Sequence, residues 1–456
     1  MKNRSNYTKL FLAGLGLATS FFVGAGAYAA NDPSITINDS TDNLYTTGAN
    51  TENTVVYDSN ANVLKLKNFH GDRVVVSNID SITIELEGEN TLSMASYGVA
   101  GSDAKAIYAP NTDLTLAGDG KLTVVDQTPN DFKINASDVV VVKNFTLDGA
   151  TLDLAFNTGA CIGSDNAWGT KINITVNSGS MKLSKCLNGI ETVDAFTVNG
   201  GTVEFGDDIA YPTSTYGSLT KNLKVTGGLL KVTGSSSGAI HVSNSVEISG
   251  GKVEIDMKGF ATPIQIEKDS ANNGSSSKRY FLISGGDLII NSEQCGITVE
   301  DADAESFIKF AGGTTTINNP NKSCKSVKIT YGAENNPNII IDKKMNLSPS
   351  DLLVKMEHND TFGTYTYYLD SETDKMQNFV ITEKIPDDPA DPSDDKKDED
   401  DVVVPSTSGK KAPNTGSNTN NQNYAIAAAI ILPVLIGAGV GVAYYIRSRK
   451  TIKFDN

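Results

Sequence analysis

The feature that most constrains the fold is a repeat in the middle of the chain. Between about residues 80 and 330, two alternating apolar residues are followed by a turn at Gly or Gly-Gly and then by a second alternating pair. Clear copies are Phe196–Phe205, Val246–Ile255 and Phe281–Ile290. Alternation with a period of two indicates strands with one buried face. Glycine supplies the positive φ angle that a tight corner between two strands requires.

The copies of this repeat recur at a nearly constant interval. The residues that follow each turn, taken as markers, are Leu92, Leu122, Leu152, Met181, Val203, Leu230, Val253, Leu288 and Thr315. The intervals between them are 30, 30, 29, 22, 27, 23, 35 and 27 residues. Short strands at such a period predict an all-β fold, a β-solenoid of about nine to ten stacked coils. A β-sandwich built of hairpins joined by Gly-Gly is the alternative interpretation.

The predicted solenoid domain covers residues 31–335, including an N-terminal cap, and residues 336–384 are expected to cap its other end. Caps are needed because open coil ends expose unpaired strand edges. With the segment Tyr57–Leu66 upstream, the repeats resemble the extracellular carbohydrate-binding domain-containing solenoids of gut and oral bacteria, over roughly residues 50 to 335. The resemblance implies a β-solenoid fold and a glycan as the partner.

Both ends of the chain predict export. Residues 1–30 combine early basic residues, an apolar run and a small-residue end at Ala27-Tyr28-Ala29, which is typical of a secretory signal peptide. An uncleaved anchor is the alternative. Residues 424–446 form an uncharged run long enough for one transmembrane helix, and the basic residues of 447–456 are expected to stay in the cytoplasm. The domain before the span is therefore expected on the extracellular face of the cell envelope.

A short motif precedes the predicted transmembrane helix. Pro413, Asn414, Thr415 and Gly416, followed by a spacer, an apolar span and a basic tail, resemble the cell-wall sorting signal of Gram-positive surface proteins. The resemblance implies cleavage between Thr415 and Gly416 by a sortase and transfer to a cell-wall precursor. Ala412 stands where that family usually has Leu, so permanent anchoring in the membrane is the alternative. Residues 385–423, which are rich in acidic side chains and proline, are expected to form an extended stalk.

Composition excludes several classes of function. The chain of 456 residues carries a formal net charge of −16, which argues against a nucleic-acid partner. Its three histidines, His70, His241 and His358, are scattered and have no nucleophile motif beside them. No catalytic residue, cofactor or metal site is therefore predicted.

One inserted polar loop is the best sequence candidate for sugar binding. Trp168 offers a flat apolar ring for stacking on a sugar, and Asp165 and Asn166 can hydrogen-bond sugar hydroxyls. The alternative is that Trp168 folds back over the edge of a coil. A separate hypothesis, cleavage of polysaccharide by clustered carboxylates, has only three candidates from neighbouring coils, which are Asp119, Asp148 and Asp153.

The four cysteines occur at intervals that match one repeat. Cys161 and Cys186 are 25 residues apart, and Cys295 and Cys324 are 29 residues apart. Residues one coil apart lie about 4.8 Å from each other, within the range of Cα separations that a disulfide spans. We therefore expect the disulfides Cys161–Cys186 and Cys295–Cys324. Four separate buried thiols are the alternative.

Together these features predict a surface-anchored, non-catalytic protein for adhesion or glycan binding. A polysaccharide-cleaving β-helix enzyme and a plain structural spacer remain alternatives. The expected partners are a sortase and its cell-wall precursor, an extracellular glycan or host surface, and the membrane through residues 424–446.

Overall fold

The computed structural model describes most of the chain between residues 32 and 384. The gaps are 39, 41, 51, 95–104, 127–137, 157–158, 166–170, 192, 207, 216–217, 235–237, 258–261, 270–277, 294, 320–323, 332–337 and 372–377. The predicted signal peptide, stalk, transmembrane helix and basic tail lie outside the described residues, as do Asn166, Trp168 and the motif Pro413–Gly416. Within the described ranges no helix has the length and apolarity that a membrane crossing requires.

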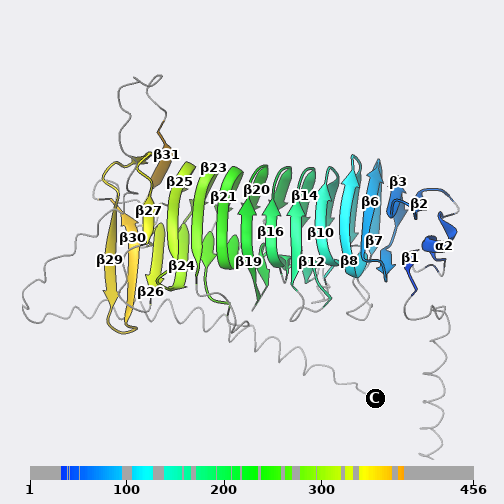
Figure 1. The fold of residues 1–456 in the computed structure, drawn as a ribbon, viewed down its shortest axis with the longest axis horizontal. Coiled ribbons are helices and arrows are strands. Elements are labelled where there is room, and N and C mark those ends of the chain that lie inside the picture. Colours follow the sequence, from blue (N-terminus) through cyan, green and yellow to red (C-terminus); the bar gives the residue numbers. More distant parts are fainter. Residues whose placement is uncertain are drawn as a thin grey trace, which may run out of the picture. The chain divides into compact units, whose positions relative to one another are not determined.

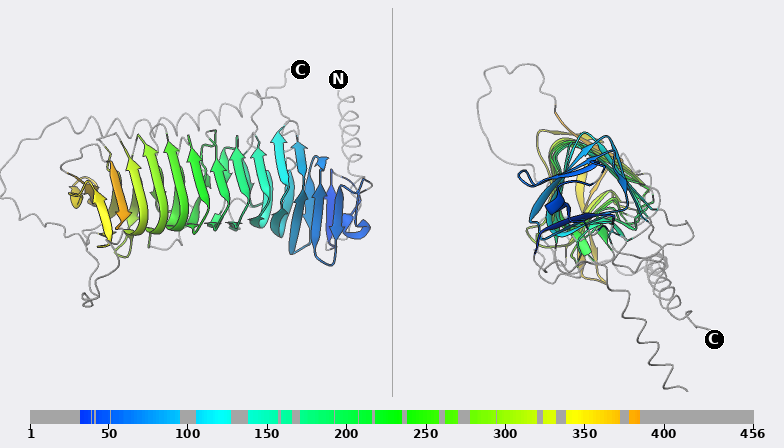
Figure 2. Two further views of the ribbon diagram at one scale, coloured as in Figure 1. Left: turned by 90° about the horizontal axis from the view of Figure 1, so that it is seen from above. Right: turned by 90° about the vertical axis from the view of Figure 1, so that its right-hand side faces the viewer.

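The described residues form an all-β fold, as the sequence predicts (Figure 1). Most strands pair in parallel with the strand at the same position of the preceding repeat, in three ladders that we call A, B and C. Along most repeats the chain passes through A, then B, then C, and the long strand β21 (Ile240–Met257) contributes to all three. Seen end on, the strands surround a shared interior (Figure 2, right).

Ladder A holds β5 (Val74–Ser77), the first parts of β8 (Ile107–Gly118) and β10 (Val140–Asp148), β12 (Ala160–Gly163), β15 (Asn188–Ile190), the first parts of β19 (Ser218–Val225) and β21, β22 (Ile264–Ile266), β24 (Ile297–Ala302) and β26 (Val327–Tyr331).

Ladder B holds β3 (Val63–Lys67), β6 (Ser81–Glu87), the later parts of β8, β10 and β19, β13 (Ile172–Val176), β16 (Val193–Val198), the middle of β21, the first parts of β23 (Tyr280–Ser292) and β25 (Phe307–Asn318), and β27 (Ile339–Ile341).

Ladder C holds β4 (His70–Gly71), β7 (Glu89–Met94), β9 (Lys121–Asp126), β11 (Thr151–Ala155), β14 (Ser180–Ser184), β17 (Thr202–Phe205), β20 (Leu229–Thr233) and the last parts of β21, β23 and β25.

Antiparallel strands lie at both ends of the ladders. At the N-terminal end β1 (Ser34–Ile37) pairs with β5 and β2 (Val55–Asp58) pairs with β3, with the short helix α2 (Leu44–Thr47) between them in sequence. At the C-terminal end β31 (Phe379–Glu383) pairs with β25 and with β28 (Met345–Ser348), while β30 (Thr364–Asp370) pairs with β26 and with β29 (Leu353–Asn359). One further short strand, β18 (Ser214–Thr215), pairs with β19. Of these strands, β1, β2, β30 and β31 pair with the end strands of ladders, whose edges would otherwise expose unpaired backbone groups.

The interior is filled by the inward residue of each strand. Phe145, Phe196, Phe205, Phe281 and Phe310 are all almost completely buried. The rings of Phe196 and Phe205 meet edge to face with centroids 6.3 Å apart. Burying each such side chain contributes about 1.5–3 kcal/mol to folding, so the repeated inward row is the main source of stability.

The corner between ladders B and C is made of stacked glycines. Gly201, Gly228, Gly251, Gly286 and Gly313 all have φ between 68° and 73°. A Cβ atom at Gly286 would lie 2.6 Å from the carbonyl oxygen of Gly251, on the neighbouring strand. Successive corners therefore approach too closely for any side chain, and glycine is required both for its backbone angle and for its size.

Eight of the nine sequence markers share one row of ladder C. From Leu122 to Thr315 each marker is paired with the next in the observed register. Leu92 is wrong as a marker, because Asn90 pairs with Leu122 and Leu92 pairs with Val124. Asn90 is buried, accepts a hydrogen bond from the Phe69 amide at 2.8 Å and donates to backbone oxygens. A polar side chain thus occupies an inward position that a hydrophobic pattern would miss.

Substituting alanine at a stacked glycine tests the corner. Gly286→Ala adds both an unfavourable φ of +73° and a clash with backbone atoms, so we expect it to lower the free energy of unfolding by about 3 kcal/mol or more. Gly363→Ala is the matched control, because Gly363 has φ +62° and no atom within 4 Å of an added Cβ. Gly363→Ala should lower the free energy of unfolding by only about 1–2 kcal/mol, as measured by chemical denaturation. Equal losses for the two variants would show that close stacking does not constrain the corner.

Candidate functional site

Asp165 belongs to a polar cluster beside ladder A. Its carboxylate lies 2.6 Å from Lys105 Nζ and accepts a hydrogen bond from the Tyr108 hydroxyl at 2.9 Å. The hydrogen bond from Lys105 is the main cause that lowers the pKa of Asp165. Burial, together with the bond to Asp165, raises the pKa of Tyr108 to about 12. The structure therefore gives Asp165 two protein partners, and its proposed role with Asn166 and Trp168 stays a prediction.

A second carboxyl group of this cluster is buried. Asp138, which precedes β10, is only 8% exposed. Burial raises the pKa of Asp138 well above its ordinary value, the nearby charge of Glu191 raises it further, and Lys105 opposes the shift. Asn188 Nδ2 donates to Glu191 Oε2 at 3.1 Å. The cluster thus holds a carboxyl group that favours its neutral form close to ionised partners.

The three carboxylates considered for cleavage do not share one row. Asp148 lies at the end of β10 in ladder B, opposite Ala117, and accepts a hydrogen bond from the Ser178 hydroxyl at 2.9 Å. Asp153 lies in ladder C, 3.3 Å from Lys121 Nζ. Asp119 lies in the turn between β8 and β9. Two of the three are therefore engaged locally, on different ladders.

The histidines are likewise separate. His241 Nε2 lies 2.8 Å from Glu267 Oε1, and Gln265 donates to the same carboxylate at 2.9 Å. Burial alone would raise the pKa of Glu267, but these hydrogen bonds outweigh it and lower the pKa. His358 pairs with Asp360 at 2.8 Å, and His70 lies in β4. Among the described residues no group of three or more His, Cys, Asp or Glu side chains is placed to hold a metal.

The four cysteines are paired in the structure. Cys161 is joined to Cys186 and Cys295 to Cys324, with Cα separations of 5.6 and 5.2 Å. Cys161 follows the start of β12, and Cys186 lies just before β15, the next strand of ladder A. Each disulfide thus joins neighbouring repeats at the intervals that the sequence displays.

A shallow pocket opens on the outer face of ladder C. It has a volume of about 220 Å³, and its lining includes Lys231 and Thr233 of β20, Glu254 and Asp256 of β21, and Ile289 and Asn291 of β23. The charged side chains come from two rows of ladder C. In one row Lys231 pairs with Glu254 and Glu254 with Ile289, and in the other Thr233 pairs with Asp256 and Asp256 with Asn291. The pocket combines ammonium, carboxylate, amide and hydroxyl groups with three aliphatic residues, Val232, Ile255 and Ile289. Such a mixture can hydrogen-bond the hydroxyls of a sugar and contact its C–H face.

The residues of this pocket share a regular position in the sequence, although the pocket was not among the predicted sites. Lys231, Glu254 and Ile289 each lie three residues after a corner glycine, at Gly228, Gly251 and Gly286. Thr233, Asp256 and Asn291 lie five residues after the same glycines. Outward positions at a fixed offset from the corner become neighbours across ladder C. What marks these residues in the sequence is therefore their constant distance from a corner glycine, not a local motif.

An aromatic pair lies on the outer side of ladder B. Tyr280 and Phe307 are paired residues of β23 and β25, and their rings stack with centroids 4.9 Å apart. The Tyr280 hydroxyl donates to Glu247 Oε1, and Lys278 Nζ lies 5.6 Å from both ring centroids. Because each ring faces the other, the pair is a compact polar-edged cluster rather than a flat platform.

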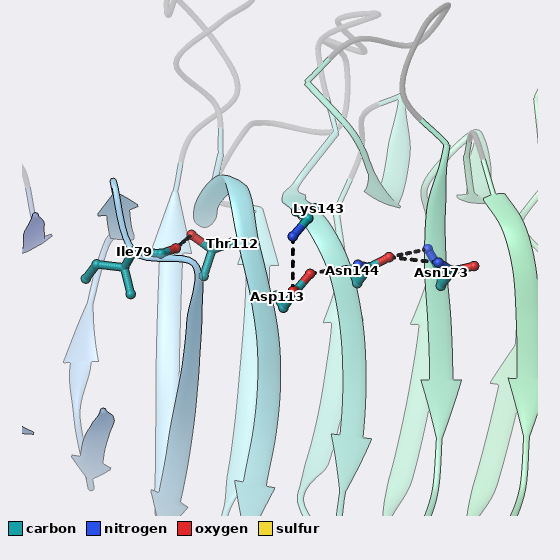
Figure 3. Close-up of polar contacts among 6 residues, drawn as sticks. All are labelled: Ile79, Thr112, Asp113, Lys143, Asn144 and Asn173. Carbon is teal, nitrogen blue, oxygen red and sulfur yellow. Dashed lines mark hydrogen bonds and ion pairs between the residues drawn. The ribbon is translucent and has the colours of Figure 1, made fainter. Parts of the chain in front are cut away.

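An amide row runs along the earlier part of ladder B, on the side nearer ladder A (Figure 3). Asn144 donates to Asp113 at 2.7 Å, and the Asn173 backbone amide donates to Asn144 Oδ1 at 2.8 Å. Lys143 Nζ lies 3.1 Å from Asp113 Oδ2. Nearby, the Thr112 hydroxyl donates to the Ile79 carbonyl oxygen at 2.7 Å. These side chains hydrogen-bond one another from strand to strand and so reinforce the ladder.

The comparison with known families supports carbohydrate binding. Residues 219–348 match the model of a family described as carbohydrate-binding domain-containing protein. The matched segment includes the pocket of ladder C, the aromatic pair and the His241–Glu267 contact. No curated protein and no solved structure matches the chain.

The buried carboxyl group predicts a pH dependence. Because the folded state raises the pKa of Asp138, it holds a proton that the unfolded chain releases as pH rises above the ordinary value of 3.8, and stability falls in that direction. Asp138→Asn stays neutral, so we expect its stability relative to wild type to increase between pH 4 and pH 7 in thermal unfolding. Glu191→Gln should make the wild-type decline shallower. If the stabilities of wild type and Asp138→Asn changed in parallel with pH, the raised pKa of Asp138 would be contradicted.

Proposed function

We propose that the chain is a non-catalytic glycan-binding protein of the cell surface, with its three ladders forming the coils of a β-solenoid. The observation that carries the proposal is the polar pocket on ladder C, which lies inside the segment that matches the carbohydrate-binding family model. Its Lys231, Glu254, Asp256 and Asn291 supply both donors and acceptors. The near-constant interval between paired strands supports the solenoid.

Binding without catalysis is the simplest use of these residues. Cleavage of a glycosidic bond generally needs two carboxyl groups on either side of the scissile bond. Glu254 and Asp256 are two residues apart on the outer face of one strand, with Lys252 in contact with Glu254. They therefore approach a sugar from the same side, which suits recognition of hydroxyl groups. Adhesion to a host or neighbouring cell would follow from such recognition at the cell surface.

We further propose that the protein is exported and fixed to the envelope through its C-terminal region. The support for this proposal is the sequence alone, namely residues 1–30, the Pro413–Gly416 motif, the apolar run 424–446 and the basic tail 447–456. On this proposal the acidic segment 385–423 keeps the ladders away from the wall.

A matched pair of double variants tests the pocket. Lys231→Met with Glu254→Gln removes two charges that line it, whereas Lys182→Met with Glu204→Gln removes the same charges from the same outward row, two strands earlier on ladder C. The full chain is screened on a glycan array in a detergent without a sugar headgroup. The pocket variant should bind its glycan about tenfold more weakly or worse, since each charged hydrogen bond is worth about 1.5–3 kcal/mol, and the control should bind as wild type. Equal binding by both variants would reject the pocket, and no signal from wild type would reject the function.

Anchoring has its own test. If a sortase cleaves after Thr415, digestion of the wall with a muramidase should release protein that lacks residues 416–456. Thr415→Ala should retain these residues and move the protein to the detergent-soluble membrane fraction. Mature wild-type protein with an intact C-terminal tail would contradict the sorting proposal and favour permanent membrane anchoring.

A further inference from the structure

Five threonines form a continuous row on the outer face of ladder B. We call them the threonine row, and they are Thr83 of β6, Thr115 of β8, Thr146 of β10, Thr175 of β13 and Thr197 of β16. Each is paired with the next in the observed register. All five are partly exposed, and each lies between two buried apolar residues. At about 4.8 Å per strand the row extends over roughly 19 Å.

Within the part of the chain that the structure describes, none of the five side-chain hydroxyls of the threonine row makes a hydrogen bond, although side chains in the rows on both sides do. On one side Asn144 bonds to Asp113, and on the other Asn199 bonds to Asn177 at 3.0 Å. The neighbouring rows therefore stabilise the ladder, whereas the threonine row presents one donor, one acceptor and one methyl group per strand to whatever lies against it.

Strand propensity alone does not account for the row. Threonine is favoured at outward strand positions in general, so the same preference should act on ladder C. The corresponding row of ladder C carries threonine on two of its early strands, at Thr91 and Thr123. It continues with Asp153, Lys182 and Glu204 on the strands that follow Thr146, Thr175 and Thr197. The row on ladder B stays uncharged over five strands, and in that row charge begins only at Lys224 and Glu247.

The absence of charge indicates the chemistry of the occupant. No member of the threonine row is ionisable, and the nearby Asp113 is paired with Lys143 at 3.1 Å. An anionic or cationic polymer would find no counter-charge in the row. A neutral polymer with many hydroxyls, by contrast, would find a matching hydroxyl at each step, with threonine methyl groups against its C–H surfaces.

We propose that the threonine row binds a straight, uncharged, β-linked polysaccharide that lies along the direction in which the strands stack. The inference rests on the proposed glycan-binding function and adds a ligand class and a second surface, outside the segment 219–348 that matches the family model. A sugar unit of an extended β-1,4-linked chain is about as long as one strand spacing, so successive units meet successive threonines. Five strands then correspond to about five sugar units.

The test uses cello-oligosaccharides of two to six units, titrated calorimetrically into the full chain in a detergent without a sugar headgroup. We expect affinity to rise with length and to level off near five units. Maltohexaose, whose α-linked chain is curved, should bind more weakly. In the triple variant Thr115→Val, Thr146→Val and Thr175→Val, the affinity for cellopentaose should fall about tenfold or more, because three hydrogen bonds are lost while shape and strand propensity are kept.

Matched variants keep the outcomes distinct. Thr91→Val, Thr123→Val and Thr151→Val remove three outward threonines of ladder C and should leave binding unchanged. The pocket variant Lys231→Met with Glu254→Gln should also leave it unchanged. If the pocket variant abolishes cellopentaose binding and the threonine-row variant does not, the proposed function stands and this inference is wrong. Binding that does not depend on the length of the oligosaccharide, or a wild-type chain that binds none of these sugars, would also overturn it.

Discussion

The close approach of backbone at the glycine corner is the constraint on which the rest of the structure depends. At Gly228, Gly251 and Gly286 the backbone adopts a positive φ and lies directly against the corresponding glycine of the strand before it. This contact fixes where ladder B ends and ladder C begins in these repeats. Once that point is fixed, alternation decides which side chains face inward, so Phe281 and Leu288 are buried on either side of one corner. The positions of the outward rows follow from the same point.

The outward rows explain how a regular fold carries different surfaces. Each ladder repeats the same backbone, so its chemistry depends only on which residues occupy a given offset from the corner. The same row of ladder C alternates acid and base at Asp153, Lys182 and Glu204, and then lines a pocket at Lys231 and Glu254. Ladder B presents threonine over the earlier repeats and the pair Tyr280–Phe307 over the later ones. A binding surface on such a fold is therefore made of residues some 20 to 35 positions apart in sequence.

The sequence could predict the features that recur and not those that depend on a single repeat. The corner markers from Leu122 onward gave the observed register, because each follows its glycine at nearly the same offset. Leu92 was wrong as a marker because Asn90, a polar residue, occupies the inward position. The side-chain amide of Asn90 hydrogen-bonds to backbone groups there. The intervals between cysteines correspond to the pairs in the structure for the same reason that the markers do.

The candidate site was harder to predict from the sequence, because no single residue of it is conspicuous. Asp165 is conspicuous, since it lies near the single tryptophan in sequence, yet its carboxylate is engaged by Lys105 and Tyr108. Lys231, Glu254 and Asn291 are individually ordinary surface residues, and only their common offset from glycine brings them into one pocket. In a fold of stacked repeats, residues at the same distance from the corner glycine become neighbours across a ladder. A functional surface therefore corresponds to one position of the repeat, compared over several successive repeats.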